Sequence, residues 1–442
     1  MNAITRAQRR NLWLASLGAM LEYYDFVVYI YVAAKIGAAF FPSGTSDSIK
    51  LMQTLGIYSL GFVIRPVAGL VIASYADRIG RKRLFIFTVA MMSISTLALG
   101  LLPTYEDIGW LAPALLLLLR VIQGCAVGGE LPSAGVFVSE HARSDRVGYS
   151  GGVLQSMAYG GFLLGASAAI VADLVATSAG YPSLSWRLPF IVGGAFGLIA
   201  GYLRRALDET PLFIAARKRA SQDVHAPLRV VVRSHRGAVF FGFGIVLVMS
   251  VMNVVFFQYW PTLLSQLGHS HSHSLAASSV AIASFMVAMP LWGLFADRFG
   301  WRACLCSGAT LLALLSMWVF QVLPGVAKDS TTLLWITVPM AIACGALVAP
   351  VPGILSSIFP TPIRQSGYAV AYNIGVAAFA GPLPLLLVWI TSTLGVPAIS
   401  WVVLAACVLA VVLGGLVGRV QQFLGTRPSA AQDLPNAQLV GH

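Results

Sequence analysis

Long apolar stretches constrain this chain more than any other feature of its sequence. A helix needs about 20 mostly apolar residues to cross the hydrocarbon layer of a bilayer. Twelve such stretches lie at about 12–34, 51–75, 84–103, 110–136, 150–175, 186–204, 237–262, 275–296, 303–323, 332–356, 367–393 and 397–418. The sequence therefore predicts an all-α membrane protein with twelve transmembrane helices.

The composition excludes a soluble enzyme and a disordered chain. Of the 442 residues, 58% are hydrophobic and only 10% are Asp, Glu, Lys or Arg, whereas an average soluble domain has about 25% charged residues. So few charges can neither cover a soluble surface nor keep a chain unfolded. The net charge of +12 would suggest a nucleic-acid partner in a soluble protein. In a membrane protein it predicts basic residues gathered on the cytoplasmic side.

The positions of the basic residues agree with a membrane protein. If the N-terminus lies inside, most of the 28 Lys and Arg residues fall in inner loops. The outer loops and span ends then hold only Lys50, Arg187 and Lys328. This bias predicts that both termini are cytoplasmic, and it removes the support for nucleic-acid binding.

A repeated motif divides the chain into halves. Ala-Ser-Tyr-Ala-Asp-Arg-Ile-Gly-Arg-Lys at 73–82 recurs as Gly-Leu-Phe-Ala-Asp-Arg-Phe-Gly-Trp-Arg at 293–302, each time between the second and third span of its half. Duplicated halves, with a substrate site near the bilayer midplane, are typical of secondary transporters. We predict an N-terminal six-helix bundle at 1–204, a cytoplasmic linker loop at 205–236, a C-terminal six-helix bundle at 237–420 and a cytoplasmic tail at 421–442.

The repeated loops predict a cytoplasmic gate. Each loop carries an Asp beside basic residues, and cations are stabilised near helix C-termini. A simple positive-inside anchor is the alternative. The candidate gate residues are Asp77, Arg78, Arg81, Glu130, Glu140, Arg146, Glu209, Asp297, Arg302 and Arg364. No Glu precedes Arg364 at the place that matches Glu140 in the first half.

Several stretches resemble known transporters. The pattern around 73–83 resembles the signature loop of the major facilitator superfamily. Glu-Tyr-Tyr-Asp-Phe at 22–26, Arg-Val-Ile-Gln-Gly-Cys-Ala-Val-Gly-Gly-Glu at 120–130 and Asp-Glu-Thr-Pro-Leu-Phe at 208–213 are similar to motifs of its metabolite:proton symporter family. The resemblance implies two pseudo-symmetric bundles, alternating access, and a monomer in a bacterial inner membrane. It implies a substrate among di- or tricarboxylates, shikimate-like acids, α-keto acids and zwitterionic osmolytes.

Three charges within the first and fourth spans suggest coupling to protons. Glu22 and Asp25 lie near the middle of the first span, three residues apart and nearly on one helix face. Arg120 lies at a similar depth in the fourth span. Ionisable residues are costly there unless paired, and a carboxylate that loses its Arg partner binds a proton more readily. We expect Asp25, or otherwise Glu22, to carry the proton, and the resemblance implies the same role. A permanent structural ion pair is the alternative.

Polar and aromatic residues within the spans are candidates for substrate binding. Amides and phenols can form hydrogen bonds with a carboxylate or a hydroxyl, although aromatic residues in membrane proteins often serve only as packing or interface anchors. The candidates are Arg120, Arg65, Tyr24, Gln123, Gln155, Tyr159, Asn253, Gln258, Tyr372 and Asn373.

These observations predict a proton-coupled symporter that imports a small organic anion. Arg65 and Arg120 favour a carboxylate metabolite. The alternatives are a proton-coupled antiporter, an uncoupled exchanger and a non-transporting membrane sensor. No catalytic, nucleotide-binding or metal-ligand pattern stands out, so we predict no enzyme, no cofactor and no metal site.

Overall fold

The computed structural model describes residues 6–206, 227–269, 271–326, 330–380 and 382–423, and these are almost entirely helical. Ten of their helices are long and apolar enough to cross a membrane. An eleventh span is made by the pair α1 and α2, which meet at an angle of 65°. The helices α17 and α18 cover the eleventh stretch of the sequence on either side of residue 381. Each of the twelve predicted spans thus coincides with a helix or a pair of helices.

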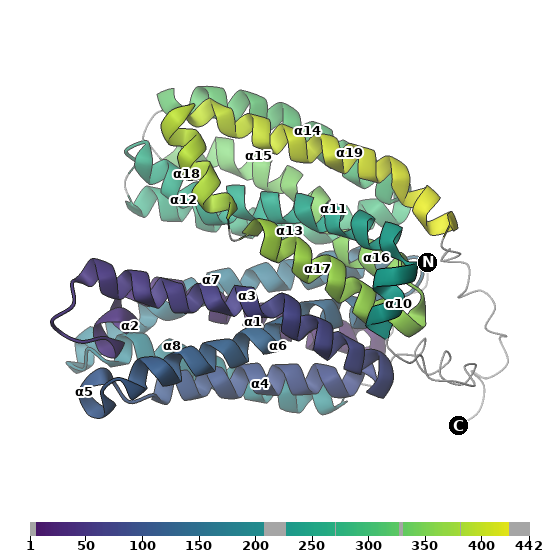
Figure 1. The fold of residues 1–442 in the computed structure, drawn as a ribbon. Coiled ribbons are helices and arrows are strands. Elements are labelled where there is room, and N and C mark those ends of the chain that lie inside the picture. Colours follow the sequence, from purple (N-terminus) through teal and green to yellow (C-terminus); the bar gives the residue numbers. More distant parts are fainter. Residues whose placement is uncertain (1–5, 207–226, 270, 327–329, 381, 424–442) are drawn as a thin grey trace.

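The first half of the chain supplies helices α1 to α8, which lie in the lower part of Figure 1. Their bounds are α1 Arg6–Tyr31, α2 Ala33–Phe40, α3 Asp47–Ile79, α4 Arg81–Leu101, α5 Tyr105–Ile108, α6 Leu111–His141, α7 Val147–Ala179 and α8 Leu184–Leu203, with the short 3-10 helix η1 at Arg204–Ala206.

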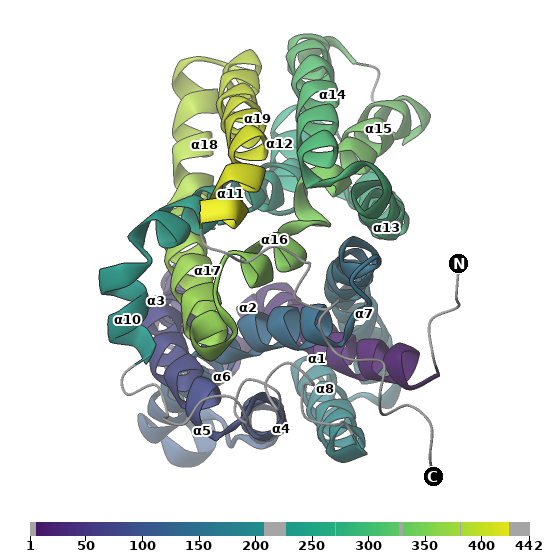
Figure 2. The same ribbon diagram turned by 90° about the vertical axis from the view of Figure 1, so that its right-hand side faces the viewer.

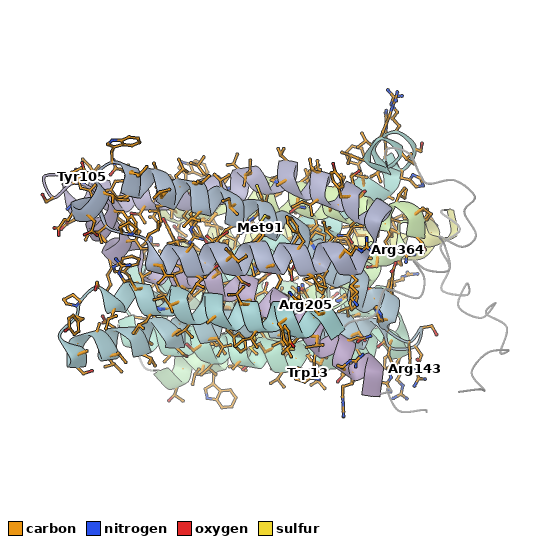
Figure 3. All side chains as sticks on the ribbon, turned by 90° about the horizontal axis from the view of Figure 1, so that it is seen from below. Trp13, Met91, Tyr105, Arg143, Arg205 and Arg364 are labelled. Atoms are coloured by element: carbon orange, nitrogen blue, oxygen red, sulfur yellow. The ribbon has the colours of Figure 1, made fainter. Side chains whose placement is uncertain are left out.

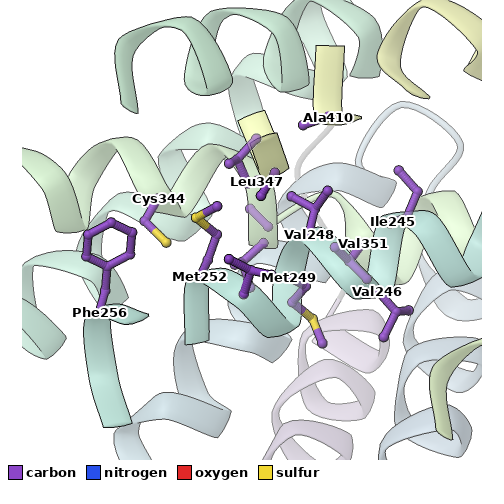
Figure 4. Close-up of a cluster of buried hydrophobic side chains, with 14 of the residues drawn as sticks. Ile245, Val246, Val248, Met249, Met252, Phe256, Cys344, Leu347, Val351 and Ala410 are labelled. Carbon is purple, nitrogen blue, oxygen red and sulfur yellow. The ribbon is translucent and has the colours of Figure 1, made fainter. Parts of the chain in front are cut away.

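The second half forms most of the upper part of Figure 1. Its helices are α10 Pro227–Ser234, α11 Arg236–Asn253, α12 Trp260–Gln266, α13 His271–Phe299, α14 Trp301–Val322, α15 Ser330–Val348, α16 Val351–Ser357, α17 Arg364–Ala380, α18 Leu383–Thr393 and α19 Ile399–Phe423. A π-helical turn, η2 Val254–Tyr259, joins α11 to α12, and the 3-10 helices are η3 Leu323–Gly325, η4 Thr361–Ile363 and η5 Val396–Ala398. Figure 4 shows the apolar core of this half, where Val248 and Met252 pack beside Leu347.

Large apolar side chains also cover the outside of the bundle. Phe240 is 74% exposed, Val63 69% and Leu314 68%. On a soluble protein such a surface would mark a partner or an aggregation site. On a bundle whose backbone groups are hydrogen-bonded within helices it is a surface suited to lipid.

The two copies of the repeated loop adopt the same turn. Gly80 ends α3 with φ 109°, and Gly300 ends α13 with φ 89°. Each amide donates to the carbonyl of the Ala four residues earlier, at 3.1 Å for Gly80 and 2.9 Å for Gly300. Glycine adopts positive φ without steric cost, so the glycine of the motif sets the tight connection between the second and third span in both halves.

The halves meet along two pairs of helices. Viewed along the bundle in Figure 2, α7 lies beside α13, and α3 lies beside α17. The first pair approaches very closely, since a Cβ atom placed on Gly148 would lie 2.6 Å from the carbonyl oxygen of Gly293. Small residues allow helices to pack backbone against backbone in this way.

The two ends of the bundle differ in charge. We call the end where α1 begins and α19 ends the basic end. Arg143 and Arg364 lie near it in Figure 3, whereas Tyr105 lies at the opposite end. The charge bias in the sequence predicts that the basic end is cytoplasmic.

Candidate functional site

A buried ion pair joins α1 to α6. Nη1 of Arg120 donates to Oδ2 of Asp25 at 3.4 Å, and the two side chains are only 6% and 8% exposed. The hydroxyl of Thr96, on α4, donates to the other oxygen of Asp25 at 2.9 Å. The structure thus brings together Asp25 and Arg120, which the sequence analysis singled out by their depth in the spans.

The amide of Gln123 completes this polar cluster. Its Oε1 accepts from Nη1 of Arg120 at 2.8 Å, and its Nε2 donates to the Thr96 hydroxyl at 2.8 Å. Sequence reasoning found Gln123 but missed Thr96, because a threonine within an apolar helix usually bonds only to its own backbone, and nothing else in the pattern marks it.

An aromatic ring supports the guanidinium of Arg120. The central carbon of Arg120 lies 3.6 Å from the centre of the Tyr29 ring, a distance at which cation–π attraction is strong. Its Nε and Nη2 have no hydrogen-bond partner among the described residues. Arg120 is therefore held by a ring and an amide as well as by Asp25, and part of its hydrogen-bonding capacity is unused.

Glu22 lies one helical turn before Asp25 and has different surroundings. It is only 4% exposed, and its Oε2 has no hydrogen-bond partner among the described residues. Glu22 and Arg65 border the same hollow as Asp25, Arg120 and Gln123. The two charged clusters are therefore continuous with each other.

A larger cavity opens between the halves beside Glu22. Its volume is about 60 Å³, which is room for several water molecules. Its polar lining includes Glu22 and Arg65 from the first half and Asn253, Gln258 and Tyr372 from the second. The structure thus gathers five of the predicted site residues around one space.

A π-helical turn shapes the second-half wall of this cavity. Nε2 of Gln258 donates to Oδ1 of Asn253, five residues earlier, at 3.0 Å. Nδ2 of Asn253 donates across the halves to the Tyr159 hydroxyl at 2.6 Å. The extra residue in each π turn brings these two amides onto one face. The sequence pattern predicted a continuous helix here and gave no sign of the turn.

The other candidate polar residues have partners of their own. Nε2 of Gln155 contacts Sδ of Met249 at 3.7 Å, and Nδ2 of Asn373 donates to the Gly128 carbonyl at 2.8 Å, both across the halves. The Tyr24 hydroxyl donates to the Pro189 carbonyl at 2.7 Å, within the apolar core of the first half. This bond holds the ring of Tyr24 against α8, and a role for Tyr24 in substrate binding stays a prediction.

Cross-half contacts close the basic end. Nη1 of Arg364 donates to Oε1 of Glu140 at 2.6 Å. The carboxylate of Asp297 accepts the backbone amides of Gly148 and Tyr149 at 2.6 and 2.8 Å. These amides belong to the first turn of α7, where unbonded N–H groups and the helix dipole favour an anion.

Arg146 and Arg302 lie near these contacts. Arg146 immediately precedes α7, where its charge attracts Asp297. Arg302 lies in the first turn of α14. The remaining gate candidates, the side chains of Asp77, Arg78 and Arg81 and the whole of Glu209, lie outside the described residues.

Glu130 lies away from the cross-half contacts, and its assignment to the gate stays a prediction. Its Oε1 accepts from Nη1 of Arg204 at 2.8 Å inside the first half, and both side chains are 0% exposed. The Thr88 hydroxyl donates to Oε2 of Glu130 at 2.7 Å. Arg204 also donates to the carbonyls of Leu14, Ala15 and Phe85 at 3.1, 2.9 and 3.2 Å.

Comparisons with known proteins agree on the fold. Residues 15–382 match the family described as Major Facilitator Superfamily. The chain is similar, at 17% identity and a TM-score of 0.73 over 94% of this chain and 96% of the other, to the proton:xylose symporter XylE bound to 6-bromo-6-deoxy-D-glucose. A partially occluded inward-open form of the xylose transporter XylE from E. coli gives 18% identity and a TM-score of 0.61 over 94% and 98%. The predicted all-α fold of twelve spans is confirmed.

Relatives in sequence are named as proline and betaine transporters. The glycine betaine/proline/ectoine/pipecolic acid transporter OusA of Dickeya dadantii (strain 3937) is 31% identical over 97% of this chain and 87% of its own length. The proline/betaine transporter of Escherichia coli (strain K12) is 31% identical over 98% and 89%. A putative proline/betaine transporter of Staphylococcus aureus (strain COL) is 30% identical over 88% and 83%.

Proposed function

The chain belongs to the major facilitator superfamily, and we propose on this premise that it imports a small zwitterionic osmolyte together with a proton. It is a multi-pass membrane transporter and not an enzyme. The substrate class, the coupling ion, the cytoplasmic position of both termini and the monomeric state are the parts of the proposal that experiments must test.

The proposed substrate class is supported by the two opposite charges that line one cavity. Glu22 and Arg65 both border the space between the halves. A di- or tricarboxylate would bring further negative charge against the buried carboxylate of Glu22, at a high cost in a medium of low polarity. Proline and betaine, which the relatives' names mention, each carry one carboxylate and one cationic nitrogen. A zwitterion therefore fits this cavity better than the organic anion that the sequence alone favoured.

The coupling proposal rests on the pair of Asp25 and Arg120. An arginine stays protonated throughout a transport cycle, so the carboxylate is the group that can gain and lose a proton. Arg120 keeps the Tyr29 ring and the Gln123 amide as partners when Asp25 becomes neutral. With these partners, Arg120 can stay buried and charged after Asp25 has taken up a proton.

Alternating access would use the two halves as moving bodies. We propose that the bundles at 1–204 and 237–420 rock about the cavity, with the segment 205–236 as their linker. The bonds from Arg364 to Glu140 and from the start of α7 to Asp297 would hold the basic end shut while the opposite end admits substrate.

Uptake into proteoliposomes tests this proposal. With an acidic exterior, the wild-type protein should accumulate glycine betaine or proline, and Asp25→Asn should abolish accumulation. The same variant should still exchange labelled for unlabelled substrate, because binding and the movement of the halves do not require Asp25 to titrate. Accumulation that persists unchanged in Asp25→Asn would remove Asp25 as the proton carrier. Uptake that requires an acidic interior instead would favour the antiporter.

A further inference from the structure

One buried carboxylate in the cavity has no part in the coupling scheme. We propose that Glu22, together with the rings of Tyr23, Phe162 and Tyr372, binds the cationic nitrogen of the substrate, while Arg65 binds its carboxylate. This inference rests on the proposed zwitterionic substrate and assigns each of its charges a place in the cavity.

The surroundings of Glu22 are the first support. Its side chain is almost fully buried, and its Oε2 lacks a hydrogen-bond partner among the described residues. An unsatisfied buried acceptor is costly, and more so when it is charged. Glu22 lines each of three neighbouring hollows between the helices. Its free oxygen is therefore available to whatever occupies this space.

Aromatic rings beside Glu22 are the second support. Tyr23 and Phe162 line the same cavity, and their ring centres lie 5.1 Å apart at an interplanar angle of 76°. Tyr372 adds a third ring from the other half. A quaternary ammonium has no N–H to donate, so aromatic faces and a nearby carboxylate are the groups that recognise it. The N–H groups of a proline-like cation can in addition donate to Glu22.

Arg65 borders the same cavity as Glu22 and supplies a positive charge there. Its guanidinium carbon lies 5.1 Å from the centre of the Phe26 ring, so this ring is covered by a cation of the protein. A guanidinium is well suited to bind a carboxylate through paired hydrogen bonds. The cavity therefore offers one acidic group beside aromatic rings and one basic group, so each charge of a zwitterion has an opposite charge to bind.

Three ligands test this division on purified full-length protein in nanodiscs by titration calorimetry. The first is glycine betaine. The second is 3,3-dimethylbutanoate, in which a neutral carbon replaces the cationic nitrogen of glycine betaine. The third is choline, which keeps the cationic nitrogen but lacks the carboxylate. The wild type should bind glycine betaine about tenfold or more tightly than 3,3-dimethylbutanoate.

Glu22→Gln should weaken the binding of glycine betaine about tenfold. It should leave the binding of 3,3-dimethylbutanoate unchanged or make it tighter, because the variant no longer repels an anion. Arg65→Gln should reverse the preference, so that choline binds better than glycine betaine.

Control variants separate recognition from folding. Phe162→Leu should weaken glycine betaine about threefold to tenfold without changing the affinity for 3,3-dimethylbutanoate. Glu106→Gln makes the same chemical change as Glu22→Gln on an exposed residue of α5, and it should leave all affinities unchanged.

Two outcomes would overturn the subsite. One is a Glu22→Gln variant that keeps the wild-type preference for glycine betaine, and the other is a wild type that binds 3,3-dimethylbutanoate as tightly as glycine betaine. A wild type that binds no zwitterion would refute both the subsite and the proposed substrate class. If Glu22→Gln loses the preference for glycine betaine, the subsite is supported even when the wild type shows no proton-driven accumulation. In that case only the proposed coupling is refuted.

Discussion

Two buried carboxylate–arginine pairs in the first half are built from similar parts. In both, a threonine of α4 donates to the carboxylate, Thr96 to Asp25 and Thr88 to Glu130. In both, the guanidinium lies over an aromatic ring, 3.6 Å from the ring centre of Tyr29 and 3.7 Å from that of Phe85. The pairs differ in how completely the arginine is hydrogen-bonded.

The nitrogens of the Arg204 side chain all donate hydrogen bonds, whereas two nitrogens of Arg120 do not. Arg204 reaches Glu130 at 2.8 Å and donates to three backbone carbonyls on α1 and α4. Arg120 reaches Asp25 only at 3.4 Å and has two nitrogens without a hydrogen-bond partner among the described residues. A fully satisfied buried pair fixes the helices that it joins, while an incompletely satisfied pair can lose its carboxylate at lower cost. The difference separates a structural tie from a group suited to change its charge state.

The largest expected effect comes from neutralising Glu130, the carboxylate that is paired with Arg204. Glu130→Gln leaves the charge of Arg204 buried without a counter-ion and should lower the free energy of unfolding by about 3–5 kcal/mol. The matched change Asp25→Asn should cost much less, because Asp25 lies 3.4 Å from Arg120 and the pair borders a hollow, whereas Glu130 lies 2.8 Å from Arg204 and both side chains are 0% exposed. Thermal unfolding in detergent measures both. Equal losses for the two variants would contradict the distinction between the pairs.

The two threonines offer a finer comparison. Thr88→Val should lower the free energy of unfolding by about 1–2 kcal/mol, since it leaves a buried carboxylate oxygen without its donor, and uptake per folded molecule should stay unchanged. Thr96→Val should instead reduce proton-driven uptake more than stability. Unfolding scans and uptake assays on both variants give the answer. Reduced uptake per folded molecule in Thr88→Val would place that threonine in transport as well.

The smallest expected effect concerns the exposed pair of Lys35 and Asp173 at the other end of the first half. Their side chains are 40% and 60% exposed, and such pairs contribute only about 0–1 kcal/mol. Lys35→Ala should therefore change the unfolding temperature little, and less still at high salt, because screening already weakens the pair. If Lys35→Ala lowered the stability as much as Glu130→Gln, the exposure of these ion pairs would not determine how much they contribute to stability.

The sequence predicted the fold and the depth of the central charges well. Membrane spans follow from the length of the apolar stretches. Asp25 and Arg120 were placed at a similar depth in the membrane because a helix rises by a fixed distance per residue. Glu140 and Arg364 were both named as gate residues. Their pairing was not, because the partners lie 224 residues apart and in different halves, so only the packing of the halves selects them.

Arg204 shows where sequence reasoning had no signal. It stands at the end of the sixth span among other basic residues, where the positive-inside bias already accounts for an arginine. Its carbonyl partners, Leu14 and Ala15, lie about 190 residues away. The sequence does not show which backbone carbonyls a side chain will bind, so the contacts of Arg204 are visible only in the three-dimensional structure.

The glycine contact between α7 and α13 gives the closed basic end an all-or-none character. A Cβ atom on Gly293 would lie only 2.3 Å from the Gly148 carbonyl oxygen, so no side chain lies between the two backbones to stretch or re-orient as they part. The amides that bind Asp297 belong to the same turn as Gly148. Steric contact and charge–amide bonding therefore form and break in one movement, and a partly opened end has neither to stabilise it.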